Sequence, residues 1–273
     1  MSYENFKPEV WSKKVQLELE KLMVFRDICN TQFQGDVGRG KTVKIIGVDR
    51  PKVNTYVPGT DILDAETPQD SSVYLAVDQF KYTHFMVDDI DGMQGDTPIM
   101  EHLMHGSATA LAEAADAYIA EKVKEAGIVI PSQAISTAAQ AKEALDEAFE
   151  KLWSNSVKIG MDTYIVVTPW FYNLFKDRLT ELHTDNTDLI NKGILGMYNG
   201  AKVVMSNNVY NDGTDDYLSV ITKDAIAFAS GIEKTEAYRP DRQFSDAVKV
   251  LHTYGAKVVR PKEMALLKVH QGS

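Results

Sequence analysis

Residues 35–42 read Gly-Asp-Val-Gly-Arg-Gly-Lys-Thr, and residues 43–51 continue as Val-Lys-Ile-Ile-Gly-Val-Asp-Arg-Pro. The first eight match the phosphate-binding loop pattern G-x-x-x-x-G-K-[ST], which holds a nucleotide's phosphates at the N-terminus of a following helix. Here the following run is β-branched and is broken by glycine and proline, which predicts a strand and a turn. We therefore interpret the stretch as a glycine-rich joint into an extended arm.

A phosphate-loop NTPase is the alternative, and it also needs an acidic residue after an apolar strand to hold Mg²⁺. Residues 85–89, Phe-Met-Val-Asp-Asp, have this form. However, no helix is predicted between the two motifs, whereas parallel strands need a crossover of a dozen or more residues, usually helical. The sequence therefore disfavours a nucleotide site.

Composition excludes several classes of protein. The chain has 273 residues, a hydrophobic content of 44%, a net charge of −10 and one cysteine, Cys29. One large domain or two small ones are expected. The acidic balance argues against a dedicated nucleic-acid binder, and a single cysteine excludes a disulfide framework within one chain. No apolar run is long enough for a membrane span, and residues 1–5 lack signal-peptide features, so we expect a soluble protein made in a reducing cytoplasm.

Charge is unevenly distributed along the predicted arm. Residues 61–101 hold ten acidic side chains against Lys81 alone, which gives an acidic limb. The basic limb, residues 39–52, holds Arg39, Lys41, Lys44, Arg50 and Lys52 against Asp49 alone. Solvated hairpin faces explain any single charge, whereas electrostatic complementarity between neighbouring copies explains the separation of the two limbs.

Three helices are predicted from their boundaries. Pro8 begins one that continues to about Asn30, and residues 96–98 open a long one that ends near Ala126. Residues 137–140, Thr-Ala-Ala-Gln, match a capping box that opens the third. The long helix is predicted to bury Ile99, Leu103, Leu111, Ala115, Tyr118 and Ile119. The third is predicted to bury Ala141, Leu145, Ala148, Phe149, Leu152 and Trp153.

Strands and helices alternate irregularly along the chain. Residues 73–78 have a half-exposed hairpin pattern, and residues 163–167 predict a buried strand followed by a helix with Thr168 as N-cap and Pro169 as first residue. Further strands are predicted at 201–205 and around 217–221 and 225–229. Two closing apolar runs, 247–259 and 263–269, are predicted to form an antiparallel pair. The mixed order indicates an α+β fold.

The sequence offers only weak candidates for catalytic or metal-binding residues. Glu101, His102 and His105 lack the order and the i, i+4 spacing of a zinc-protease helix, so interface or partly buried histidines are expected. Asp88, Asp89, Asp91 and Asp96 do not fit a calcium-binding EF-hand loop, because counting back from Gly92 places Val87 at the first ligand position. We therefore predict no catalytic residue, no metal site and no cofactor.

Four stretches of the second half carry a resemblance through their order and spacing. They are 163–179 (TYIVVTPWFYNLFKDRL), 191–209 (NKGILGMYNGAKVVMSNNV), 238–244 (YRPDRQF) and 248–269 (VKVLHTYGAKVVRPKEMALLKV). The series resembles the tailed-bacteriophage major capsid proteins, whose fold is named after phage Hong Kong ninety-seven. The upstream order of helical arm, long two-stranded arm and long spine helix also fits this family.

The resemblance implies an N-terminal arm over 1–34, an extended β-hairpin loop over 35–86, a peripheral domain over 87–130 and 231–273, and an axial domain over 131–230. It implies a non-enzymatic coat protein that self-assembles into hexamers and pentamers, forming the icosahedral shell around double-stranded phage DNA. The inter-subunit residues of the extended loop would be Arg39, Lys41, Lys44, Arg50, Lys52, Tyr56, Ile62 and Leu63. The axis-facing loop would be 207–216, with Asn208, Tyr210 and Asp212, although an ordinary polar turn also explains it.

The resemblance also implies partners. The helical arm begins at Pro8, which leaves no room for an N-terminal scaffolding segment of about a hundred residues, so a separate scaffolding protein is expected. A portal protein and DNA bound without sequence specificity would complete the particle, with no membrane, after assembly in the host cytoplasm. Some family members form Lys–Asn isopeptide bonds late in the peripheral domain. Residues 212–273 contain no asparagine, so we expect a non-covalent shell. An encapsulin-like nanocompartment shell protein is the alternative within this fold.

Overall fold

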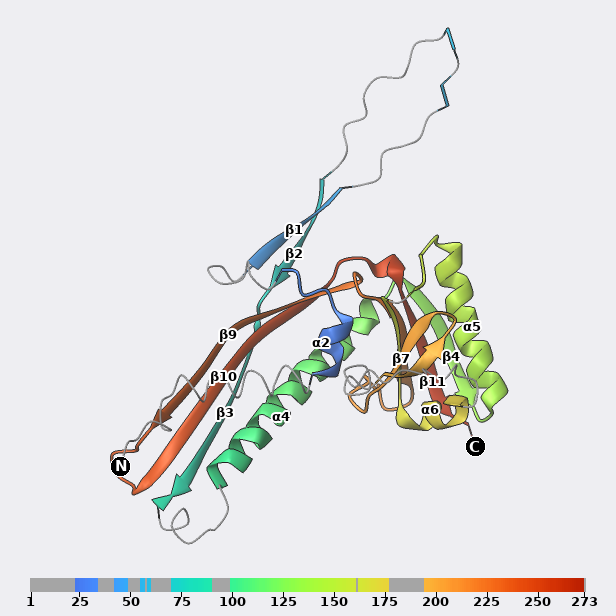
Figure 1. The fold of residues 1–273 in the computed structure, drawn as a ribbon. Coiled ribbons are helices and arrows are strands. Elements are labelled where there is room, and N and C mark those ends of the chain that lie inside the picture. Colours follow the sequence, from blue (N-terminus) through green and yellow to red (C-terminus); the bar gives the residue numbers. More distant parts are fainter. Residues whose placement is uncertain are drawn as a thin grey trace.

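The computed structural model describes residues 23–33, 42–48, 55–56, 58–59, 70–89, 99–160, 162–176 and 194–272. Two bodies and a projecting hairpin make up the molecule (Figure 1). One body is a three-stranded sheet with a long helix beside it, and the other is a six-stranded sheet with a helix against it. This mixed arrangement agrees with the predicted α+β class.

The three-stranded sheet has the order β3-β10-β9, and both pairings are antiparallel. Its strands are β3 (Gln79–Asp88), β9 (Ile226–Tyr238) and β10 (Ser245–Val258). One face packs on the long helix α4 (Ile99–Glu121), which a short 3₁₀ helix, η3 (Lys122–Glu125), extends. The predicted long helix is therefore confirmed. Of its predicted buried face, Leu111, Ala115 and Ile119 are buried, Ile99 and Tyr118 are half-buried, and Leu103 is 38% exposed.

The six-stranded sheet has the order β4-β11-β8-β5-β7-β6. Its strands are β4 (Ile128–Ile135), β5 (Thr163–Val167), β6 (Ile194–Tyr198), β7 (Ala201–Met205), β8 (Asp216–Thr222) and β11 (Met264–Gln271). One face packs on α5 (Ala138–Ser154) and α6 (Pro169–Phe175), and the other contributes to the core around α4. Among the described residues, no helix has both the length and the apolar character to cross a membrane.

The two predicted helix starts in this body are confirmed. The Thr137 side chain accepts a hydrogen bond from the Gln140 backbone, and the Gln140 side chain accepts one from the Thr137 N–H, at 3.1 Å, so the capping box is complete. Thr168 is the N-cap of α6, with Pro169 in its first turn. On α5 the predicted buried face is correct except at Trp153, which is 52% exposed and whose ring centroid lies 5.7 Å from that of Phe149.

The predicted antiparallel pairing of the two closing runs is wrong. Strand β10 pairs with β3 and β9, whereas β11 pairs with β4 and β8 in the other sheet. A 3₁₀ turn, η5 (Pro261–Glu263), redirects the chain between them. The Pro261 carbonyl accepts a 2.8 Å hydrogen bond from the Gly127 N–H, and a Cβ on Gly127 would lie 2.7 Å from that oxygen. This contact fixes the turn that sequence pattern alone predicted as a hairpin.

Strand β4 is a missed element, because Pro131 interrupts its apolar run. It is an edge strand, parallel to β11, and the register shifts opposite Leu267 and Val269, where Pro131 lies. Proline is tolerated at edges and bulges, where its missing N–H breaks no ladder.

The hairpin confirms the strand predicted after residues 35–42. Strand β1 (Thr42–Val48) pairs antiparallel with β2 (Asp70–Ala76), with Val43 opposite Leu75. At its root, β2 contacts β10, and a Cβ on Gly255 would lie 2.0 Å from the Ala76 carbonyl oxygen and 2.9 Å from the Val77 Cα. Only glycine fits this backbone crossing.

We predict that Gly255→Ala destabilises the protein by about 2 kcal/mol or more, because the clash is with backbone atoms that cannot rotate away. The midpoint and slope of urea unfolding measure the change. The matched control is Gly106→Ala on α4, where a new Cβ meets nothing within 4 Å. This control should stabilise the helix by about 0.5–1 kcal/mol. Equal unfolding free energies for Gly255→Ala and wild type would contradict the crossing.

Candidate assembly surfaces

Among the hairpin residues that the structure describes, the buried side chains lie at its root. There, Val43, Ile45, Leu75 and Val77 form a small cluster with Ala227 and Ala229 of β9. On the other face of the hairpin, Lys44 lies opposite Tyr74, which is 58% exposed. Tyr56, in the region between the strands, is 64% exposed. The hairpin therefore presents tyrosine side chains to solvent while it points away from both bodies (Figure 1).

The structure describes two of the eight residues predicted to act between subunits, namely Lys44 and Tyr56. Lys44 is exposed on β1 and Tyr56 is exposed beyond it. The six others lie outside the described residues: Arg39, Lys41, Arg50, Lys52, Ile62 and Leu63. Their role between subunits stays a prediction.

The N-terminal arm segment is joined to α4 by one buried carboxylate. Helix α2 (Val24–Ile28) has no side-chain cap of its own. Asp116 of α4 accepts hydrogen bonds from the N–H groups of Val24, at 2.9 Å, and Phe25, at 3.1 Å. Asp116 therefore satisfies two of the backbone donors that a helix start leaves unpaired.

Burial dominates the electrostatics of this contact. Asp116 is 1% exposed, and burial raises its pKa from 3.8 to about 7, with smaller contributions in the same direction from Asp27 and Glu113. The two N–H donors act in the opposite direction by stabilising the charged form. Burial, with Asp116 nearby, also raises the pKa of the Cys29 thiol, which keeps it protonated.

A second attachment follows α2. The Asn30 N–H donates to the Ile226 carbonyl at 2.8 Å, and the Phe228 N–H donates to the Asn30 carbonyl at 3.0 Å. The Asn30 side chain also donates to Asp224 at 3.0 Å. The arm segment is thus fixed to α4 at one end and to the start of β9 at the other.

The three-stranded sheet exposes a row of large side chains on the face away from α4. On the edge strand β3, alternate residues Phe80, Tyr82 and Met86 are 56%, 74% and 49% exposed. Tyr238 of β9 is 42% exposed, and its hydroxyl lies 2.9 Å from His84 Nε2. Soluble monomers rarely expose apolar patches of this kind without a partner.

The loop predicted to face the axis is held by its own polar groups. The Asp212 carboxylate accepts from the backbone N–H groups of Thr214 and Asp215, at 2.9 and 2.8 Å. These donors lower the pKa of Asp212. Tyr210 packs edge-on against Tyr217, and the Lys124 ammonium lies 3.7 Å from its ring centroid. Asn208 donates its N–H to Ser206 Oγ at 3.1 Å. That this loop faces a symmetry axis stays a prediction.

A cluster of one Ser, one His and one Asp side chain lies beside this loop, and its geometry indicates a structural role and not a catalytic one. Asp215 Oδ1 lies 2.8 Å from both Ser132 Oγ and His270 Nδ1, and Ser132 Oγ lies 3.4 Å from the same Nδ1. A nucleophilic triad places the hydroxyl and the carboxylate on opposite ring nitrogens. Here both face Nδ1, so the cluster joins β4, β11 and the loop. Among the described residues, no group of three His, Cys, Asp or Glu side chains has metal-binding geometry.

Comparison with known proteins identifies the family. No protein-family model matches the sequence, and no curated protein is similar enough to match. A solved chain from Mycobacterium phage Che8 is 30% identical, each chain covers 90% of the other, and the TM-score is 0.73. This chain belongs to the tailed-bacteriophage major capsid proteins.

Two further solved structures share the fold. A capsid structure of cyanophage P-SCSP1u is 19% identical, covering 91% of this chain and 88% of that one, with a TM-score of 0.66. A virus-like particle from Pyrococcus furiosus is 11% identical, covering 91% of this chain and 98% of that one, with a TM-score of 0.53. As a major capsid protein, this chain forms the icosahedral shell of the virion and has the phage capsid fold.

Sequence reasoning missed the residues that attach the arms of this capsid protein. Asp116 follows Ala115 on the buried side of α4, and an acid among the residues of an apolar face was the available signal. Gly255 lies inside a strand pattern, where an isolated glycine indicates a close backbone approach. Neither pattern indicates which residue is contacted, because Val24 and Ala76 are far away in sequence from Asp116 and Gly255.

We predict that Asp116→Asn changes how stability depends on pH. Because folding raises the pKa of Asp116 from 3.8 to about 7, its contribution is full below pH 3.8 and is lost as the pH rises through 7. The neutral Asn escapes this loss, so the variant should gain on wild type by on the order of 2 kcal/mol between pH 5 and pH 8. Urea unfolding at both pH values measures it.

Asp241→Asn, at an exposed position, is the matched control for the loss of one carboxylate. If the difference in unfolding free energy between Asp116→Asn and wild type is the same at pH 5 and pH 8, the buried carboxylate does not titrate between these values.

Proposed function

We propose that this capsid protein assembles into hexamers and pentamers that enclose double-stranded DNA, and that it has no enzymatic activity. The 30% identity to the Mycobacterium phage Che8 chain over 90% of both chains is the observation that supports this most. Shells of this kind repeat one chain in rings, with the same surfaces used at every contact.

The hairpin is the element that joins neighbouring copies in this proposal. It presents Tyr56 and Tyr74 to solvent, and of its described residues those at the root pack against its own subunit. Tyrosine supplies large contact area at low conformational cost, which suits an interface. The basic limb with Lys44, and Ile62 and Leu63, would complete the contact on a neighbouring subunit.

In this proposal each of the two bodies has its own role in assembly. The peripheral domain, 87–130 with 231–273, would form a stiff plate from α4 and the three-stranded sheet. The axial domain, 131–230, would meet its symmetry mates through loop 207–216. The extended loop over 35–86 and the N-terminal arm over 1–34 would join adjacent plates. These boundaries are part of the proposal.

The remaining partners follow from the same proposal. A separate scaffolding protein would set the size of the shell during assembly in the host cytoplasm, and a portal protein would occupy one vertex. Packaged DNA would be held without sequence specificity. Because residues 212–273 lack asparagine, the shell would be non-covalent.

A nanocompartment shell around protein cargo is the second candidate, because the Pyrococcus furiosus virus-like particle shares the fold. Its lower TM-score of 0.53, against 0.73 for the phage chain, favours the phage capsid. A phosphate-loop NTPase has no comparable support, since strand β1 begins at Thr42, where the nucleotide site needs a helix.

We predict that the purified protein, alone or with its scaffolding partner, forms capsomer rings or closed shells in negative-stain electron microscopy. The exposed hairpin and the exposed sheet face each leave apolar area that association would bury. Sedimentation at several concentrations gives the assembled fraction. A protein that stays monomeric under all these conditions would contradict the proposed assembly.

A further inference from the structure

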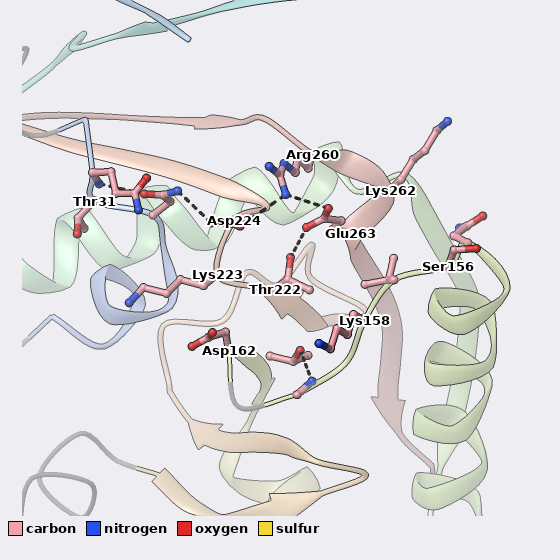
Figure 2. A pocket seen from close by; sticks show the side chains of 16 residues that line it. Thr31, Ser156, Lys158, Asp162, Thr222, Lys223, Asp224, Arg260, Lys262 and Glu263 are labelled. Atoms are coloured by element: carbon pink, nitrogen blue, oxygen red, sulfur yellow. Dashed lines mark hydrogen bonds and ion pairs between the residues drawn. The ribbon is translucent and has the colours of Figure 1, made fainter. Parts of the chain in front are cut away.

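A large polar groove lies where the chain crosses between the two bodies. Its volume is about 1020 Å³. The walls come from the end of the arm segment at Asn30, the α5–β5 link, the β8–β9 turn and the β10–β11 turn. Figure 2 shows these four segments around the groove. After β5 the chain passes between the two sheets at the β8–β9 turn and at the β10–β11 turn, and both turns line this groove.

The groove has an excess of unpaired positive charge. Arg260 is engaged, because its guanidinium lies 3.5 Å from Asp224 and 3.2 Å from Glu263 (Figure 2). Glu263 also accepts a 2.8 Å hydrogen bond from Thr222. By contrast, Lys158, Lys223 and Lys262 line the groove without an ion pair to any described residue. Asp162 is the one lining carboxylate that is not engaged in this way. On a chain of net charge −10, this surface attracts an anionic partner.

The residues that line the groove indicate which kind of anionic partner it fits. Val157 is its one large apolar side chain, and the rest of the lining is divided almost entirely between uncharged polar residues (asparagine, glutamine, serine and threonine) and charged residues. Such a lining suits an extended polar peptide, which needs hydrogen bonds along its backbone. Three carboxylates in the groove would repel the continuous phosphates of DNA, because DNA binding depends on neutralising many phosphates with cations. A short peptide with separated acidic residues fits better.

The chain itself carries such a peptide. Residues 53–70 contain Asp61, Asp64, Glu66 and Asp70 and no basic side chain. Strands β1 and β2, which flank this segment in the sequence, extend away from both bodies of their own subunit (Figure 1). A groove on another copy is therefore a better receiving surface for the segment than the groove of its own subunit.

We infer that the groove between the bodies binds the acidic segment 61–70 of a second copy. The inference rests on the proposed assembly and adds the receiving surface, with Lys158, Lys223 and Lys262 as its cationic contacts. Opposite charges at this contact steer neighbouring copies together and fix their register, and the contact weakens as salt is added.

Charge reversal tests this pairing. The groove variant carries Lys158→Glu and Lys223→Glu, and the arm variant carries Asp64→Lys and Glu66→Lys. Each should lower the assembled fraction at low salt by roughly fivefold or more, and the combined variant should recover to within about twofold of wild type. Lys142→Glu with Lys151→Glu, on the exposed side of α5, gives the same change in charge outside the groove and should assemble normally.

A second measurement does not depend on how well the reversals fold. Lys158→Cys with Asp64→Cys in the same chain should give a ladder of disulfide-linked species on a non-reducing gel, beginning with a dimer near 60 kDa, whereas either substitution alone should not. The native Cys29 is buried and adds little background.

Three results would overturn the inference. They are a combined reversal variant whose loss is the product of the two separate losses, absence of the linked dimer, and loss of DNA retention with normal assembly in the groove variant. A wild-type protein that forms neither rings nor shells would instead overturn the proposed function, so the two failures are distinguishable.

Discussion

A backbone crossing at Gly255 determines where the hairpin of this capsid protein points. The Ala76 carbonyl lies where a Cβ of residue 255 would be, so β2 contacts β10 more closely than any side chain allows. Leu75 and Val77 are buried against β9 at the same place. Packing against β9 and the close contact with β10 therefore fix the root of the hairpin, and strands β1 and β2 extend from it away from both bodies (Figure 1).

Two other contacts fix the elements around this crossing. The 3₁₀ turn at Pro261 rests on the Gly127 N–H and sends the chain from β10 into the second sheet. Asp116 holds the start of α2 on the long helix at the cost of burying a carboxylate. Together they attach the turn between the two sheets and the arm segment to the long helix and its neighbours. Packed elements of this kind deform little, which suits a subunit of a shell.

Local patterns predicted the local elements well. The capping box at Thr137, the proline start of α6 and the strand after residues 35–42 each depend on neighbouring residues and are confirmed. The predicted pairing of the two closing strands was wrong. Whether β10 and β11 pair depends on Gly127, which is over a hundred residues away in sequence. Strand β4 was missed because its apolar run contains Pro131, a residue that strands tolerate at a sheet edge. Attachment residues such as Asp116 were missed for the same reason, since their partners are distant in sequence.

The central claim is that the hairpin of each copy is bound by a neighbour. Electron cryomicroscopy of assembled particles, at a resolution that traces the backbone, tests it directly. We predict that residues 42–76 leave their own subunit and lie on an adjacent one, with the root still crossing β10 at Gly255. A hairpin folded back onto its own bodies in every subunit of a closed shell would contradict the account.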